Sequence, residues 1–172
     1  MALALSLLFD RDASQAVLRL WQGLADARIS SDMLELNYPP HLTLLVLDDE
    51  TRDGIFASAL TDLAPLAPRS LLMGDIATFA QSEVVYIGLE GDLSQLFALH
   101  RAASAIVPED DIHPHYRTAS WTPHVTLQTI GDVSRAEQLA RDRWRPRHTA
   151  VPVRLELAYF RPVRIGNGIA LA

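Results

Sequence analysis

A five-residue pattern occurs twice in this chain and constrains its fold more than any other feature. Pro-His-Leu-Thr-Leu occupies residues 40–44, and Pro-His-Val-Thr-Leu occupies residues 123–127. The two copies lie 83 residues apart in a chain of 172, and each stands in a β-rich run. Because segments of about 80 residues are marginal as independent domains, we predict that the halves, about 1–80 and 81–172, pack into one pseudo-twofold domain spanning residues 1–172.

The spacing of apolar residues predicts strands and helices in alternation. Strands are expected over residues 1–9, 41–47, 71–79, 84–89, 123–127 and 151–159, with a Gly-Asn-Gly turn at 166–168 leading into a last strand at 169–171. Helices are expected over about 12–27, 55–63, 92–106 and 134–144, the last one capped by Ser134. We predict an α+β fold of two similar lobes, with mainly antiparallel sheets lining a central cleft and helices outside.

Composition excludes several classes of protein. The net charge of −6 argues against an extended nucleic-acid surface, although the segment 135–148 holds five arginines, which we interpret as a solvated helix end rather than an RNA-contacting patch. The chain has no cysteine, which excludes disulfides, thiolate metal sites and cysteine nucleophiles. No apolar run approaches the ~20 residues of a membrane span, so we expect a cytoplasmic protein without a membrane partner. We also expect a monomer.

The repeated pattern places chemically useful side chains together. Alternate residues of a strand share a face, so His41 projects with Thr43, and His124 projects with Thr126. An imidazole can give or take a proton near neutral pH, and a hydroxyl beside it can donate to a phosphate oxygen. Chance would produce about 0.3 His-x-Thr triplets in a chain of this composition. Two copies at matching places in a repeat therefore predict one cleft with two histidines, whose nearest ring nitrogens we expect roughly 5 to 8 Å apart.

Two other interpretations of the histidines compete with a proton-transfer pair. Strand packing explains either copy alone, because threonine is favoured in strands. A catalytic zinc site takes three protein ligands, and no carboxylate or third histidine lies at a matching spacing, so we expect no metal and no cofactor. His113 and His115 are interpreted as parts of a polar loop.

Aromatic and basic residues near the two motifs are candidates for substrate binding. Tyr116, Arg117 and Trp121 lead into the second motif, and Tyr38 precedes the first. Aromatic faces stack on nucleobases and arginine binds phosphate, so these four residues are predicted to contact substrate. For Trp121, covering the end of a sheet is an equally good explanation.

Beyond the motifs, several segments resemble a known family over nearly the whole chain. They are the opening strand ending in Phe9-Asp10, Leu20-Trp21, Thr78-Phe79, Val84-Val-Tyr-Ile-Gly88 and Leu99-His100. With the paired His-x-Thr motifs, the sequence resembles the two-histidine (2H) phosphoesterase superfamily, and within it the bacterial 2′-5′ RNA ligase-like proteins.

The resemblance implies metal-independent hydrolysis of a cyclic phosphodiester. It assigns His41 and His124 as general acid and base, in undecided order, and Thr43 and Thr126 as phosphate ligands. The implied substrate is the 2′,3′-cyclic phosphate of an RNA end or a small cyclic nucleotide. Reversible 2′-5′ RNA ligation and non-catalytic binding of nucleotide or RNA stay open as alternatives.

Overall fold

The computed structural model describes residues 2–48, 52–160 and 162–171. Its strands are β1 (Ala2–Phe9), β2 (His41–Leu47), β3 (Leu71–Thr78), β4 (Val85–Glu90), β5 (His124–Gln128), β6 (His148–Ala150), β7 (Pro152–Phe160) and β8 (Arg164–Ala170). Its α-helices are α1 (Arg11–Asp26), α2 (Asp32–Glu35), α3 (Asp53–Leu63), α4 (Ser94–Ser104) and α5 (Val133–Arg143). Short 3₁₀ turns follow α3 at Ala64–Leu66 and precede β5 at Glu109–Asp111 and Pro114–Tyr116. Met1, where the first strand was predicted to begin, lies outside the described residues.

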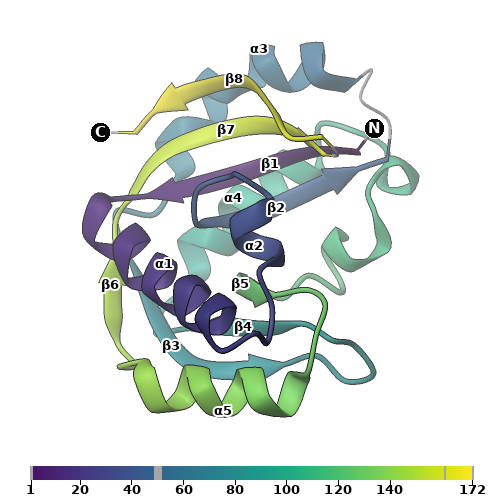
Figure 1. The fold of residues 1–172 in the computed structure, drawn as a ribbon. Coiled ribbons are helices and arrows are strands. Elements are labelled where there is room, and N and C mark those ends of the chain that lie inside the picture. The colour runs from purple at the N-terminus through teal and green to yellow at the C-terminus, as the bar shows by residue number, and fades with distance from the viewer. Residues whose placement is uncertain (1, 49–51, 161, 172) are drawn as a thin grey trace.

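The strands form one sheet, in the order β6-β3-β4-β5-β2-β1-β7-β8, and every described pairing between them is antiparallel. The predicted α+β class and antiparallel strands are therefore confirmed. The two lobes share this sheet instead of carrying separate ones (Figure 1).

The two lobes meet where the repeated motifs pair. Leu42 of β2 lies opposite Val125 of β5, and these residues hold the same place in the two copies of the motif. A local twofold axis therefore passes between them. One lobe contains β1, β2, β7 and β8, which come from the two ends of the chain, and the other contains β3 to β6, which come from its middle.

The sheet curls because its edge strand runs directly into an inner strand. Only Val151 separates β6, at one edge, from β7, near the other (Figure 1). Asp10 clamps this junction: its N–H donates to the Val151 carbonyl at 2.8 Å, and its carboxylate accepts from the Val151 N–H at 3.2 Å. The end of β1 is thereby tied to the crossing between the lobes.

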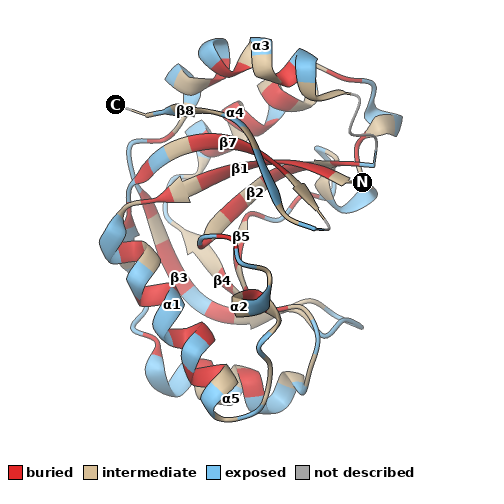
Figure 2. Ribbon diagram, turned by 45° about the horizontal axis from the view of Figure 1, so that its top comes forward, coloured by how far each residue is buried: buried red, intermediate tan, exposed pale blue. Residues whose placement is uncertain are grey.

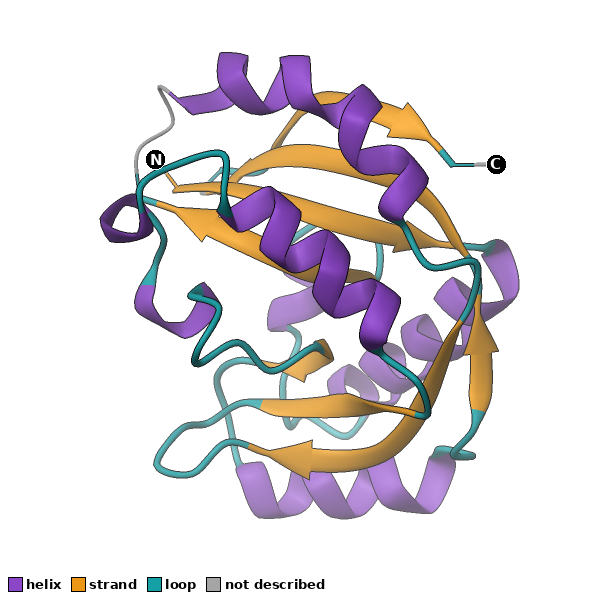
Figure 3. Cartoon of the chain, turned by 180° about the vertical axis from the view of Figure 1, so that it is seen from behind, coloured by secondary structure: helices purple, strands orange, loops and turns teal. Residues whose placement is uncertain are grey.

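Each lobe has its own pair of covering helices. α1 and α5 pack together and contact β3, β4, β5 and β6, whereas α3 and α4 contact β7, β8 and β2 (Figure 3). β1 lies in the middle of the molecule, and Leu3 to Leu7 are all buried (Figure 2). Both faces of this strand are therefore covered by other parts of the protein. Alternation of apolar and polar residues identifies strands with one exposed face, so it does not detect such burial.

Two local predictions were wrong, and one short strand was not predicted. Residues 166–168 lie inside β8, and the reversal after β7 comes earlier, around Pro162 and Val163, because β8 pairs with β7 along most of its length. The three-residue strand β6 was missed, since its length is below what a period-two pattern can signal. Helix α5 is capped by Asp132, whose carboxylate accepts from the Arg135 N–H at 3.1 Å, and not by Ser134.

Candidate active site

The floor of the site is made of four side chains from the two central strands. Leu42 and Val125 are fully buried, so the residues on either side of them, His41, Thr43, His124 and Thr126, face the opposite way and are partly exposed. Continuing the register places His41 across from Thr126 and Thr43 across from His124. Diagonal neighbours in such a pair lie roughly 7 to 8 Å apart, so the two histidines can flank one phosphate.

Both imidazole rings are oriented by the same backbone device. Nδ1 of His41 lies 2.8 Å from the Pro39 carbonyl oxygen, and Nδ1 of His124 lies 2.7 Å from the Thr122 carbonyl oxygen. A carbonyl only accepts, so each Nδ1 must carry the proton. Nε2 is left on both rings as the nitrogen that can take a proton from, or give one to, a substrate.

Burial lowers the pKa of both histidines. For His41 burial and, to a smaller extent, the neighbouring His124 lower the pKa to about 4, against the opposing effect of the bond to Pro39. Burial also lowers the pKa of His124, opposed by the bond to Thr122. A charge on His124 therefore opposes the protonation of His41.

Two buried tryptophans hold the backbone of the two threonines. The indole N–H of Trp21, on α1, donates to the Thr126 carbonyl at 3.0 Å, and the indole N–H of Trp121 donates to the Thr43 carbonyl at 3.1 Å. Trp121 is 6% exposed, and its ring stacks on His100 at 3.9 Å between centroids. It therefore supports the floor from below, and a face of its ring is already occupied.

Different aromatic rings surround each histidine. Tyr38 meets His41 edge to face at 4.8 Å between ring centroids. On the other side, Phe79 and Tyr86 lie 5.1 and 5.2 Å from the His124 ring and stack on each other. These contacts limit how far either imidazole can rotate.

Tyr38 is itself held by a buried carboxylate. Its hydroxyl donates to Glu156 at 3.1 Å, and Glu156 also accepts from the Arg154 guanidinium. Tyr38 and Glu156 are both buried. Burial and the negative charge of Glu156 raise the pKa of the Tyr38 hydroxyl, which therefore stays protonated. Tyr38 is thus placed to position His41, and its face is not open for stacking on a base.

A cavity of about 640 Å³ opens beside His124. One wall is the β3–β4 loop around Phe79 to Ser82, and the other is the segment His113 to Thr122. Tyr116 lines it, and its hydroxyl lies close to the Thr43 side chain. Arg117 is not among its lining residues, because the guanidinium donates to the Ile112 carbonyl at 3.1 Å and faces Asp110.

A family model decides the relationship of this chain to known proteins. The model of the 2′-5′ RNA ligase superfamily matches residues 13–159. The chain belongs to this superfamily. Its resemblance to the two-histidine phosphoesterases is therefore confirmed. No curated protein matches the sequence significantly.

Solved structures show the same fold as this 2′-5′ RNA ligase superfamily member. E. coli LigT complexed with 3′-AMP aligns with a TM-score of 0.60 and 16% identity, covering 99% of this chain and 96% of LigT. The protein TT0787 of Thermus thermophilus aligns with a TM-score of 0.63 and 16% identity, covering 99% of this chain and 98% of TT0787. Kluyveromyces marxianus Usb1 aligns with a TM-score of 0.53 and 14% identity, covering 99% of this chain and 97% of Usb1.

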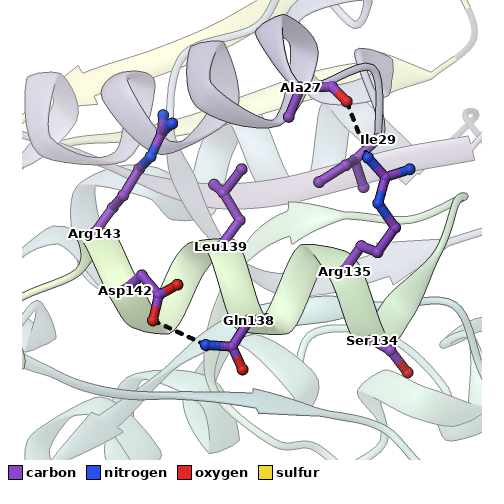
Figure 4. Close-up of a pocket in the computed structure, with 8 residues that line it drawn as sticks. All are labelled: Ala27, Ile29, Ser134, Arg135, Gln138, Leu139, Asp142 and Arg143. Atoms are coloured by element: carbon purple, nitrogen blue, oxygen red, sulfur yellow. Dashed lines mark hydrogen bonds between the residues drawn. The ribbon is translucent and has the colours of Figure 1, made fainter.

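A second cavity of the superfamily member, about 500 Å³, lies on the arginine-rich helix α5 (Figure 4). Arg135 reaches across it to the Ala27 carbonyl at 3.3 Å, and Arg143 lies against Gly23 of α1. Arg141 pairs with Glu137 on the same helix at 2.8 Å. Arg135 and Arg143 contact α1 or the residue that follows it, and Arg141 pairs within α5. These contacts favour the interpretation of this segment as a helix end over an RNA-contacting patch.

Neither a metal cluster nor a membrane span is evident in the described part of the chain. Across residues 2–48, 52–160 and 162–171, no three His, Asp or Glu side chains come together as a metal site would require. None of the helices described has the length and apolar character needed to cross a membrane.

Sequence reasoning missed several residues that shape the site. The carbonyls of Pro39 and Thr122 occupy matching places in the repeat, two residues before each histidine, and this spacing was a usable signal. Phe79, Tyr86 and Trp21 lie in segments that carry the family resemblance, but no role in the site was predicted for them. The contact of Tyr86 with His124 and that of Trp21 with Thr126 join segments far apart in the chain, which a local pattern does not reveal.

Proposed function

We propose that this chain is a metal-independent phosphodiesterase that hydrolyses a 2′,3′-cyclic phosphate, at an RNA end or in a small cyclic nucleotide. The observation that carries the proposal is the matched orientation of His41 and His124. Each ring uses Nδ1 to bind a backbone carbonyl and keeps Nε2 for the substrate, on a face shared with two threonine hydroxyls.

The reaction needs proton transfer on opposite sides of one phosphorus. A water attacks phosphorus in line with the departing ribose oxygen, one group removes the proton from the water, and a second protonates that oxygen. Thr43 and Thr126 donate to the non-bridging oxygens. The product is a ribose phosphomonoester, and the proton balance is closed because the base ends protonated and the acid ends neutral.

The environments of the two histidines suggest their roles. His41 has a pKa of about 4 and is neutral at physiological pH, as a general base must be. His124 borders the cavity, where the nucleoside of the substrate would lie, and can protonate the ribose oxygen that leaves toward it. The phosphate anion raises the pKa of the nearby imidazole and so favours the protonated acid.

The family name and a neighbouring structure bear on the substrate. LigT was solved with 3′-AMP, a nucleotide, which supports a nucleotide ligand for this chain as well. The name of the superfamily favours ligation as a second candidate. Ligation is the same chemistry with a ribose 5′-hydroxyl attacking in place of water, so the same two histidines serve both reactions.

The decisive experiment measures kcat and Kd of variants on a panel of 2′,3′-cyclic phosphates. His41→Ala and His124→Ala should each lose roughly 10²- to 10⁴-fold in kcat, and the double variant should lose less than the product of the two. Thr43→Val and Thr126→Val should also weaken binding, by about 10- to 150-fold. Thr149→Val, at an exposed position on β6, is the control and should keep full activity.

Chelator should leave the activity unchanged. Activity that needs added zinc, or that survives in His124→Ala, would overturn the mechanism. Tight nucleotide binding without turnover in the native protein would favour a binding module instead.

A further inference from the structure

The cavity beside His124 is larger than one cyclic phosphate requires. Its volume of about 640 Å³ is in the range of sites that enclose a whole nucleotide-sized ligand. It lies on one side of the twofold axis only: His124 and Thr126 line it, and His41 and Thr43 are not among its lining residues. The substrate therefore extends from the catalytic floor in one direction.

The chemistry of the lining favours an anion. The chain contains 21 acidic residues, yet none of the described residues that line this cavity carries a carboxylate. Its polar groups are imidazoles, hydroxyls and one amide, which come from His113, His115, Ser82, Ser120, Thr122, Thr129 and Gln81. The hydroxyls of Ser82, Ser120 and Thr129 already donate to the Phe79 carbonyl, the Pro114 carbonyl and the Asp32 carboxylate. The donors that remain for a phosphate therefore include the imidazoles of His113 and His115 and the amide of Gln81.

His113 and His115 form the most distinctive part of that wall. Their rings lie 5.3 Å apart between centroids. Nδ1 of His113 is buried and has no hydrogen-bond partner in the structure. A buried polar atom without a partner is costly, so a rotation of the His113 ring that brings this nitrogen to a ligand in the cavity would gain a hydrogen bond.

The loop that carries the two histidines is fixed to the sheet next to the catalytic floor. The His113 N–H donates to the Val46 carbonyl of β2 at 2.8 Å, and Ile112 forms a bridge with Leu47. On its other side, Arg52 pairs with Asp111 at 2.8 Å. Rigid support of this kind is what a binding subsite needs to hold its donors in place.

We propose that His113 and His115 form a second phosphate-binding subsite, which receives a phosphate one ribose away from the cyclic phosphate. The inference rests on the proposed function and narrows its substrate class. A nucleoside 2′,3′-cyclic phosphate lacks this second phosphate. An RNA 3′ end carries it as the preceding phosphodiester, and a 5′-phosphorylated nucleotide carries it as a phosphomonoester.

The test compares three substrates: adenosine 2′,3′-cyclic phosphate, the same compound with a 5′-phosphate, and the dinucleotide ApA ending in a 2′,3′-cyclic phosphate. The native protein should prefer both phosphorylated forms in kcat/KM by about 10- to 150-fold, through KM. Preference for the dinucleotide over the monophosphate would identify an RNA end, and the reverse order a small nucleotide.

Two substitutions and a matched control separate the subsite from the catalytic floor. His115→Ala, at an exposed position, and His113→Ala should each remove most of the preference, and kcat/KM should fall far more for the two phosphorylated compounds than for the unphosphorylated one. Thr118→Ala, an exposed residue of the same loop that does not line the cavity, should keep the full preference. A thermal melt of each variant shows whether it is folded.

Binding measurements keep the inference testable if the proposed function fails. Calorimetric Kd values for adenosine 3′,5′-bisphosphate and adenosine 3′-monophosphate require no turnover. The bisphosphate should bind more tightly, and His115→Ala should abolish the difference. Equal affinity for the two compounds in the native protein, or a preference that persists in folded His115→Ala and His113→Ala, would overturn the subsite whatever the outcome of the activity assays.

Discussion

Replacing His41 with asparagine should change how the stability of the protein depends on pH. Asparagine can still donate to the Pro39 carbonyl, as Nδ1 of His41 does, but it does not titrate. In the folded protein burial and His124 lower the pKa of His41 from 6.5 to about 4. In the unfolded chain the ring has its ordinary value.

The sign follows from counting protons. Between pH 6.5 and 4 the unfolded chain binds the His41 proton and the folded protein does not, so the free energy of unfolding falls as the pH falls through this window. Above 6.5 neither state binds the proton, and below 4 both do. A pKa of about 4 instead of 6.5 corresponds to about 3 kcal/mol over the whole window.

Urea denaturation at intervals from pH 7.5 to pH 4, for the native protein and for His41→Asn, measures this difference. Other titrating groups contribute to both proteins, so subtracting the two curves isolates His41. The native protein should lose about 3 kcal/mol more than the variant between pH 6.5 and pH 4. In His124→Asn the loss should be smaller, because a neighbouring charge that lowers the His41 pKa is gone. If the difference in the free energy of unfolding did not change with pH, His41 would be well solvated in the folded protein. The assignment of His41 as general base would then lose its physical basis.

Three further predictions concern the same site. The pH profile of kcat/KM should be bell-shaped with its optimum below neutrality, because both histidine pKa values are lowered in the free protein. The pH profile of kcat should lie at higher pH, because bound phosphate raises both histidine pKa values. Identical profiles for kcat/KM and kcat would contradict this. Tyr38→Phe keeps the ring against His41 but leaves buried Glu156 without one donor. This variant should lower the free energy of unfolding, measured by urea denaturation, by about 1.5 to 3 kcal/mol with little loss of kcat. Tyr38→Ala should lower kcat as well. Trp21→Phe should lower the free energy of unfolding by at least about 1 kcal/mol and raise KM, because the Thr126 carbonyl loses its indole donor. An unchanged KM would show that strand pairing alone positions Thr126.

The floor of the candidate site could be predicted because it depends on local rules. The side chains of a strand alternate, so His41 and Thr43 had to share a face whatever the rest of the chain did. The repeat supplied the second pair, and the structure places the equivalent residues Leu42 and Val125 directly across from each other. Most strands and helices were also within reach, because each one carries its own apolar period.

Contacts between distant segments could not be read in this way. Tyr38 meets Glu156, and Trp21 meets Thr126, across more than a hundred residues. Strand β6 and the start of β8 exist through pairing with β3 and β7, and their own residues signal a turn or nothing. Such elements are decided by the sheet around them.

The sequence by itself determined which residues form the floor of the candidate site, because the two histidines and two threonines are specified by a repeated local motif. Only the tertiary structure decided how the two copies differ. The motifs are nearly identical, but His41 is packed against Tyr38, and His124 opens onto a cavity lined by His113 and His115. A symmetric motif cannot encode that difference. It arises because the segments that fold over each strand come from unrelated parts of the chain, and their packing sets the burial, the pKa and the access of each ring.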